Sequence, residues 1–195
     1  MTDIFLNHLW PSLAVWAVIY ASDYFFTIAC ARLYRATAKD QIIFEGSFEL
    51  NPNFQKDVDG LRRLSPRFLL ALLASTTFLA LLWWVTGIDP TLRGFYIFGL
   101  GILFLTELAL QTRHLRNFFL FRTAFGPDGI RGRIEYPRRV MLQLSSFEFL
   151  GFAGLYLVLF LLTWNWFVLG GAMGCSWRSP GNTASSPANT SSQQL

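Results

Sequence analysis

Three carboxylic acids stand inside long apolar stretches of this chain: Asp23, Glu107 and Glu148. Each lies nine positions from an arginine near one end of its stretch, and Thr76 has the same spacing in the remaining stretch. At 1.5 Å of rise per helical residue, all four side chains are expected about 13 Å from a common boundary. Acids at that depth indicate a functional site, because a carboxylate that faces lipid is costly.

Further polar side chains accompany these acids. In the third stretch Glu107, Gln111 and His114 follow one another at spacings of four and three, so they share one face of a helix. The supporting polar residues expected around the acids are Thr27, Thr76, Gln111 and Ser145. The sequence thus predicts a polar face on each of four helices.

If the helices turn these faces inward, the acids meet, and three like charges a few ångströms apart cannot all stay ionised without a partner. They then require a bound proton or a cation. Carboxylate oxygens suit Mg²⁺, Ca²⁺ or Mn²⁺, and an added imidazole would admit Zn²⁺ or Fe²⁺. We therefore predict an ion or proton site at Asp23, Glu107, Glu148 and His114, with a divalent cation as its candidate cofactor.

Two structural interpretations compete with this site. In the first, the acids pair inside the protein with arginines such as Arg113 or Arg116, and the ion pairs hold the helices together. In the second, Glu107 and Glu148 lie close enough to the membrane interface for their side chains to reach water. Sequence alone leaves all three interpretations open.

The composition predicts the architecture that positions these residues. Of the 195 residues, 53% are hydrophobic and only 14% are charged, whereas about 25% are charged in soluble domains. At about 20 residues per span, the length suits an all-α bundle of four transmembrane helices. The predicted spans are residues 9–33, 68–86, 95–114 and 140–170. They form one transmembrane domain, residues 1–174, followed by a disordered external tail, residues 175–195, which is rich in Ser, Thr, Asn and Pro.

Basic residues predict the orientation. The two loops at residues 34–66 and 115–139, with the helix ends beside them, hold 14 of the 16 basic residues, and only Arg93 and Arg178 remain for the other side. Cytoplasmic loops carry this excess, so both termini are expected outside the inner or plasma membrane. All seven tryptophans fall toward the ends that this topology makes external, as an aromatic belt would.

The two cytoplasmic loops contain short strand patterns. The first loop alternates apolar and polar residues around Gly46 and Ser47, as a hairpin would, and Ile130–Tyr136 could form a strand in the second. We expect the loops to pair into a small β cap, and the alternative is that each lies separately on the lipid surface. Glu49 could lean over the acids, but we expect it on a solvated loop face.

Several function classes remain. No nucleophile–base or phosphate-loop motif is found, so an enzyme is less favoured, and nucleic acid is not expected because the charges gather in two loops beside the bilayer. Those loops are expected to contact anionic headgroups. The first hypothesis is a cation- or proton-linked transporter or channel component, expected to form a homo-oligomer. The alternatives are an accessory or assembly subunit of a larger membrane complex and an interfacial lipid-modifying enzyme.

Overall fold

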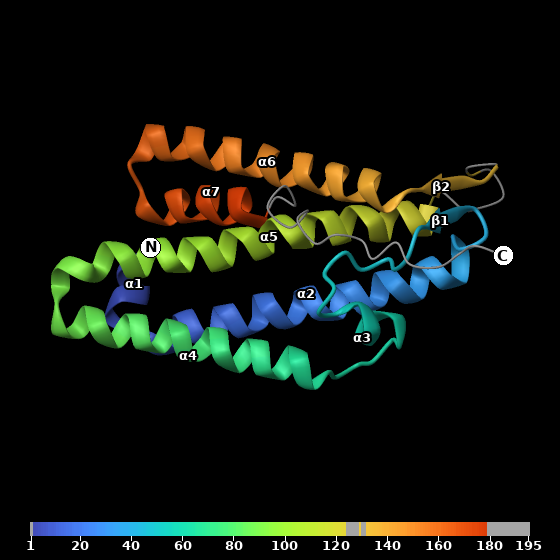
Figure 1. Ribbon diagram of the computed structural model, residues 1–195. Coiled ribbons are helices and arrows are strands. Elements are labelled where there is room, and N and C mark those ends of the chain that lie inside the picture. The colour runs from blue at the N-terminus through green and yellow to red at the C-terminus, as the bar shows by residue number, and fades with distance from the viewer. Residues whose placement is uncertain (1, 124–128, 130–131, 179–195) are drawn as a thin grey trace, which may run out of the picture.

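The computed structural model describes residues 2–123, 129 and 132–178. Four of its helices are long and apolar enough to cross a membrane, as the sequence predicted. They are α2, α4, α5 and α6 in Figure 1. The elements in chain order are α1 (Thr2–Asn7), α2 (Leu9–Thr37), β1 (Ile42–Phe44), α3 (Gln55–Asp59), α4 (Pro66–Ile88), the 3₁₀ turn η1 (Pro90–Leu92), α5 (Arg93–Thr123), β2 (Ile134–Tyr136), α6 (Arg138–Thr163) and α7 (Trp166–Arg178).

Local sequence explains where α4 begins. The Ser65 hydroxyl accepts hydrogen bonds from the backbone N–H groups of Arg67 and Phe68, and Pro66 occupies the first helical turn. A capping serine followed by proline satisfies amide groups that have no partner within the helix and fixes the entry of the chain. The start of α4 therefore follows from two adjacent residues.

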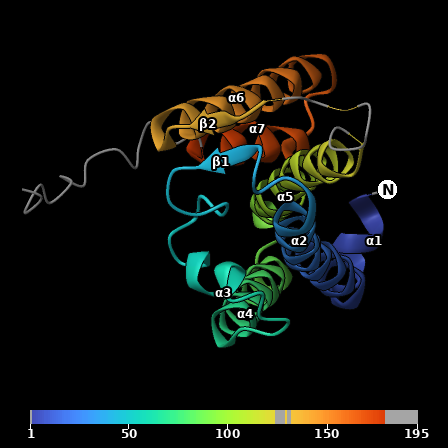
Figure 2. The same cartoon turned by 90° about the vertical axis from the view of Figure 1, so that its right-hand side faces the viewer.

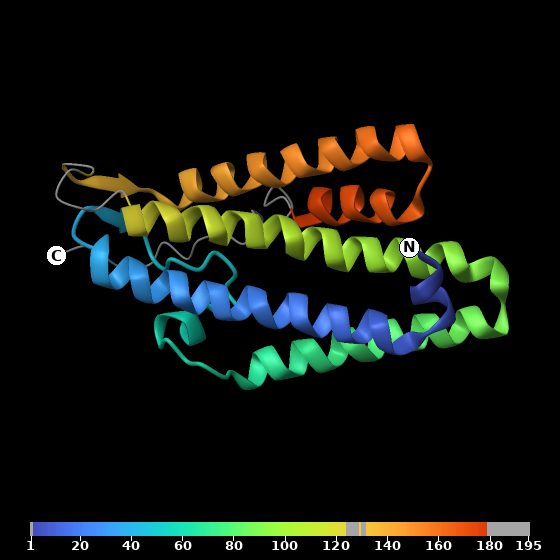
Figure 3. The ribbon, with the colours of Figure 1, turned by 180° about the vertical axis from the view of Figure 1, so that it is seen from behind.

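Helix α5 lies at the centre of the bundle. Helix α2 runs beside it (Figure 3), and α4 packs against both of these helices. One apolar cluster between them includes Trp16 of α2, Leu79 of α4, and Tyr96 and Leu100 of α5. Large apolar side chains of α4 and α6 remain exposed, as expected of lipid-facing helices.

The fourth predicted span, residues 140–170, is wrong at its end. Helix α6 stops at Thr163, Trp164 adopts a left-handed backbone with φ of 50°, and α7 turns back beside α5 and α6 (Figure 1). With 13 residues, α7 is about 20 Å long, too short for a hydrocarbon core of about 30 Å. The predicted tail from residue 175 also starts too early, because α7 continues through Arg178; residues 179–195 lie outside the described part of the chain.

Glycines allow α7 to approach α5 closely. A Cβ atom added at Gly101 of α5 would fall on the backbone of Phe167, and one at Gly170 of α7 would fall on the backbone of Phe98. The two helices therefore touch backbone to backbone, a contact that only residues without side chains permit.

The two connecting segments pair as a parallel sheet, which confirms the predicted β cap (Figure 2). The register joins Ile42 to Ile134, Ile43 to Glu135 and Phe44 to Tyr136. The expected hairpin around Gly46 is not formed, since only the first half of its pattern is a strand and its partner comes from the other segment. We call the end of the bundle that carries β1 and β2 the sheet end.

Candidate functional site

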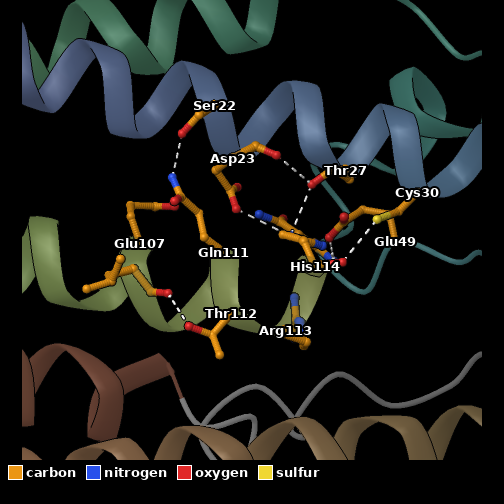
Figure 4. Close-up of polar contacts among 12 residues, drawn as sticks. Ser22, Asp23, Thr27, Cys30, Glu49, Glu107, Gln111, Thr112, Arg113 and His114 are labelled. Carbon is orange, nitrogen blue, oxygen red and sulfur yellow. Dashed lines mark hydrogen bonds and ion pairs between the residues drawn. The ribbon is translucent and has the colours of Figure 1, made fainter. Parts of the chain in front are cut away.

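Helices α2 and α5 bring together Asp23 and His114, two of the predicted site residues (Figure 4). The Oδ1 atom of Asp23 lies 3.3 Å from Nε2 of His114; His114 is buried, and the Asp23 side chain is 18% exposed. Thr27, one helical turn after Asp23, places its hydroxyl 3.1 Å from the same nitrogen. The imidazole is thus held by two groups of α2.

The hydrogen bonds assign a role to each ring nitrogen of His114. The Thr27 hydroxyl donates its proton to the backbone carbonyl of Asp23 at 3.0 Å, so it accepts from Nε2–H of His114. The other ring nitrogen, Nδ1, is buried and has no hydrogen-bond partner among the described residues. One nitrogen therefore anchors the ring, and the other is left to take a proton or another ligand.

Glu107 has a partner that sequence analysis did not foresee. Arg178, at the end of α7, places Nη1 3.2 Å from Oε1 of Glu107, while Oε2 of Glu107 is buried and lacks a hydrogen-bond partner among the described residues. Glu107 is 5% exposed, and the Arg178 side chain is 42% exposed. Arg178, which we expected at the external end, instead lies beside an acid in the middle of α5.

Gln111 links the same two helices. Its side-chain amide donates to the Ser22 hydroxyl at 2.6 Å and to the Ile19 carbonyl at 2.8 Å (Figure 4). Of the predicted face, Gln111 and His114 are therefore directed toward α2, whereas Glu107 contacts Arg178 of α7.

Glu148 does not join this group. It forms an ion pair with Arg116, and the nearby Ser145 accepts a hydrogen bond of 2.7 Å from Arg113. The nine-residue spacing fixes the depth of a side chain but not the rotation of its helix, and α6 packs mainly on α7. Thr76 is likewise outside the group, because its hydroxyl donates to the Leu72 carbonyl of its own helix.

The predicted divalent-cation site is corrected by this geometry. Asp23 faces His114, whereas Glu107 and Glu148 face arginines. Within the described ranges there is no group of three or more His, Cys, Asp and Glu side chains that could hold a metal ion. Arginines lie beside Glu107 and Glu148, where the predicted cation would have bound.

A third acid, Glu49, reaches this region from the first connecting segment. Glu49 is half-buried rather than solvated, and its Oε1 accepts the backbone N–H of Asn51 at 2.8 Å. Burial raises the pKa of Glu49, while the Asn51 hydrogen bond and the charges of Arg113 and Arg178 act in the opposite direction. Asp23 lies within electrostatic reach of the same charges and of Glu107. We call Asp23, Glu49, Glu107, Arg113, His114 and Arg178 the polar layer.

No protein family, curated protein or solved structure matches this chain. The chemistry of the polar layer is therefore the guide to its function.

Of the members of the polar layer, Arg178 was not predicted from the sequence, and Glu49 was expected on a solvated loop face. A signal for the helix that carries Arg178 is present, because the Asn165 side chain accepts the Phe167 N–H and so caps a new helix within an apolar run. Gly170 and Gly174 follow at a spacing of four, which suits close helix contact. For Glu49 we find no comparable local signal.

Proposed function

We propose that this multi-pass membrane protein binds protons at the Asp23–His114 pair and acts as a component of a proton-linked transporter or channel. The observation that carries the proposal is a buried imidazole whose Nε2 faces an acid at 3.3 Å and whose Nδ1 has no partner among the described residues. Such a pair can bind and release protons as a unit, because both groups titrate and the protonation of one affects the pKa of the other.

The charges of the polar layer favour a proton over a metal cation. Its three carboxylates and two guanidinium groups leave one negative charge when His114 is neutral. One added proton neutralises this charge in place, whereas a divalent cation would leave an excess positive charge and displace an arginine from an acid. Glu107, one oxygen of which has no hydrogen-bond partner in the described part of the chain, is the second acceptor in the layer.

We place the entrance for the proton at the sheet end. Glu49 comes from the segment at the sheet end, whereas the apolar cluster of Trp16, Tyr96 and Leu100 fills the bundle on the other side. A proton entering from the sheet end would pass Glu49 before it reached Asp23, and it would need a rearrangement of α2 against α5 to leave by the opposite end. Four spans are few for a transporter, so the proposal includes a homo-oligomer.

We further propose that the sheet end is cytoplasmic and that the N-terminus is external, because the connecting segments there, together with the helix ends beside them, carry 14 of the 16 basic residues. Asp40 and Thr91 are exposed at opposite ends of the bundle, and both native cysteines are buried. A membrane-impermeant maleimide applied to intact cells should label Thr91→Cys and leave Asp40→Cys unlabelled. The reverse pattern would invert the topology.

The histidine content permits a direct test of proton binding. The chain has only two histidines, His8 and His114, so ¹⁵N-histidine labelling of the His8→Gln variant in lipid gives the signals of His114 alone. We expect an Nε2-protonated ring whose Nδ1 signal changes on acidification, and Asp23→Asn should alter that change. Thr112→Val, at an exposed position of α5, serves as the control. A ring that behaves like free histidine, or that ignores Asp23→Asn, would contradict proton binding at this pair.

Transport needs a separate measurement. Proteoliposomes with an internal pH dye should show proton entry beyond that of empty vesicles, and Asp23→Asn should abolish it while Thr112→Val retains it. Wild-type vesicles no leakier than empty ones would contradict transport by this chain alone, whatever the NMR result.

A further inference from the structure

A cavity of about 170 Å³, open to the outside, lies at the sheet end between α5, α6 and the two-stranded sheet. One wall is apolar and includes Phe44, Phe48, Leu120, Met141 and Leu144. Arg113, Arg116, Ser145 and Glu148 also line it. The cavity is therefore amphipathic, and since Arg116 is paired with Glu148, its polar side carries one net positive charge beside the apolar wall.

Arg113 has hydrogen-bonding capacity left over. Its Nη1 donates to the Ser145 hydroxyl at 2.7 Å, and its guanidinium carbon lies 5.8 Å from the centre of the Phe149 ring. In the part of the chain that the structure describes, Arg113 forms no ion pair with a carboxylate. A guanidinium has five N–H donors in a planar fork that matches two oxygens of a phosphate.

The residues around the cavity suit an amphiphilic ligand. Helices α5 and α6 present exposed leucines at the edge of the cavity, Leu120 and Leu144, so the apolar wall continues onto the lipid-facing surface of the bundle. Arg116, one helical turn beyond Arg113, lies nearer the end of α5, at the level where a span reaches the headgroups. A molecule that fits has an anionic phosphate at one end and an acyl chain at the other.

We infer that this cavity binds one anionic phospholipid, with its phosphate at Arg113 and Arg116 and an acyl chain along Phe44, Leu120 and Met141. This differs from the general attraction of basic loops to a charged membrane, because it requires particular side chains around one cavity. It does not depend on the proposed proton site, although Arg113 belongs to both.

The test uses the full chain and two lipids of equal chain length, phosphatidylglycerol and phosphatidylcholine. Native mass spectrometry of the protein in detergent should show one retained lipid, with about tenfold preference for phosphatidylglycerol, or about 1.4 kcal/mol. The variant Arg113→Gln/Arg116→Gln should lose the preference. The matched control, Arg32→Gln/Arg122→Gln, removes the same charge from exposed sheet-end positions that do not line the cavity, and should keep it.

Each other outcome overturns the inference. No lipid preference in the wild type would mean that the cavity does not select an anionic phospholipid. If the control variant lost the preference for phosphatidylglycerol equally, the preference would depend only on overall charge. If glycerol phosphate displaced the retained lipid as readily as phosphatidylglycerol does, the site would be one for a soluble phosphate. Thermal unfolding transitions of both variants, followed by tryptophan fluorescence, establish that they are folded before binding is compared.

Discussion

The guanidinium of Arg178 lies 3.2 Å from the carboxylate of Glu107, although 71 positions separate the two residues. The last described residue of a half-length helix thus meets an acid in the middle of a full-length one. Each charge alone would be unfavourable in apolar surroundings, and together they neutralise each other where α7 ends. The turn at Trp164 directs α7 back along α5, and the ion pair then places the end of α7 in the polar layer.

We expect the pair to stabilise the position of α7. Arg178→Gln leaves the buried Glu107 carboxylate without its partner, and Glu107→Gln leaves the arginine alone. Each change should lower the unfolding free energy by less than the about 3–5 kcal/mol seen when a fully buried pair is broken, because the Arg178 side chain is 42% exposed. The measurement is thermal unfolding in detergent, followed by tryptophan fluorescence.

The double variant Glu107→Gln/Arg178→Gln separates pairing from other effects. It removes both charges, so it should lower the unfolding free energy by less than the sum of the decreases caused by the two single variants. Arg93→Gln, at an exposed position remote from the pair, is the control and should be close to neutral. Strictly additive single losses would show that the two side chains do not stabilise each other.

Close packing of α7 on α5 gives a second prediction. Gly101→Ala should destabilise the protein by at least the about 1–3 kcal/mol typical of overpacking, because its new methyl group meets the Phe167 backbone, which cannot move aside. For a chain of this size, 1 kcal/mol corresponds to roughly 2–4 °C in melting temperature. The melting temperature should therefore fall by several degrees.

Gly154→Ala is the matched control. Both glycines lie within helices, so both substitutions gain the same helix propensity, but a Cβ atom at Gly154 meets nothing within 4 Å. Gly154→Ala should leave the melting temperature unchanged or slightly raised. If the two variants had the same melting temperature, α7 would not lie against α5 as described.

These contacts explain why more of the fold than of the candidate site could be predicted from the sequence. Apolar length is a local property, so four spans were predictable, and the strand patterns in the two connecting segments were enough to suggest their pairing. The turn at Trp164 was missed because an apolar run continues through it, and hydropathy does not register a change of direction.

At the site, the spacing along α5 predicted that Gln111 and His114 share a face, and both contact α2. The sequence could not give the rotation of α6, and so Glu148 was wrongly grouped with Asp23. The partners of the acids come from distant segments: Arg178 reaches Glu107 only because α7 folds back. Long-range placement of this kind depends on packing between helices, which no single-helix pattern contains.

Glu49 provides a prediction for pH. Burial raises the pKa of Glu49 in the folded protein, so the folded state binds its proton more tightly than the unfolded state does. The resulting stabilisation is fully present at a pH below the pKa that Glu49 has in the unfolded protein. It is lost as the pH rises through the higher pKa that Glu49 has in the folded protein. Between about pH 4 and pH 7, the wild-type melting temperature should fall more than that of Glu49→Gln. Asp40→Asn, at an exposed position, should follow the wild type.

The two-stranded sheet can be tested by cross-linking, because its register specifies which side chains are neighbours. Ile43 pairs with Glu135, so their side chains leave the same face of the sheet, whereas Ile134 projects from the other face. In oxidising conditions Ile43→Cys/Glu135→Cys should form a disulfide, since paired strand positions have Cα atoms about 5 Å apart. Ile43→Cys/Ile134→Cys should remain reduced. The two native cysteines are buried and contribute little background.

A maleimide mass tag added after oxidation reads the outcome as a gel shift. The first double variant should resist tagging until it is reduced, and the second should be tagged at both introduced thiols. If the two segments instead lay apart on the lipid surface, neither pair would be held at bonding distance and both variants would be tagged alike. Equal and rapid oxidation of both pairs would also contradict the sheet, because it would require segments that sample many registers instead of one.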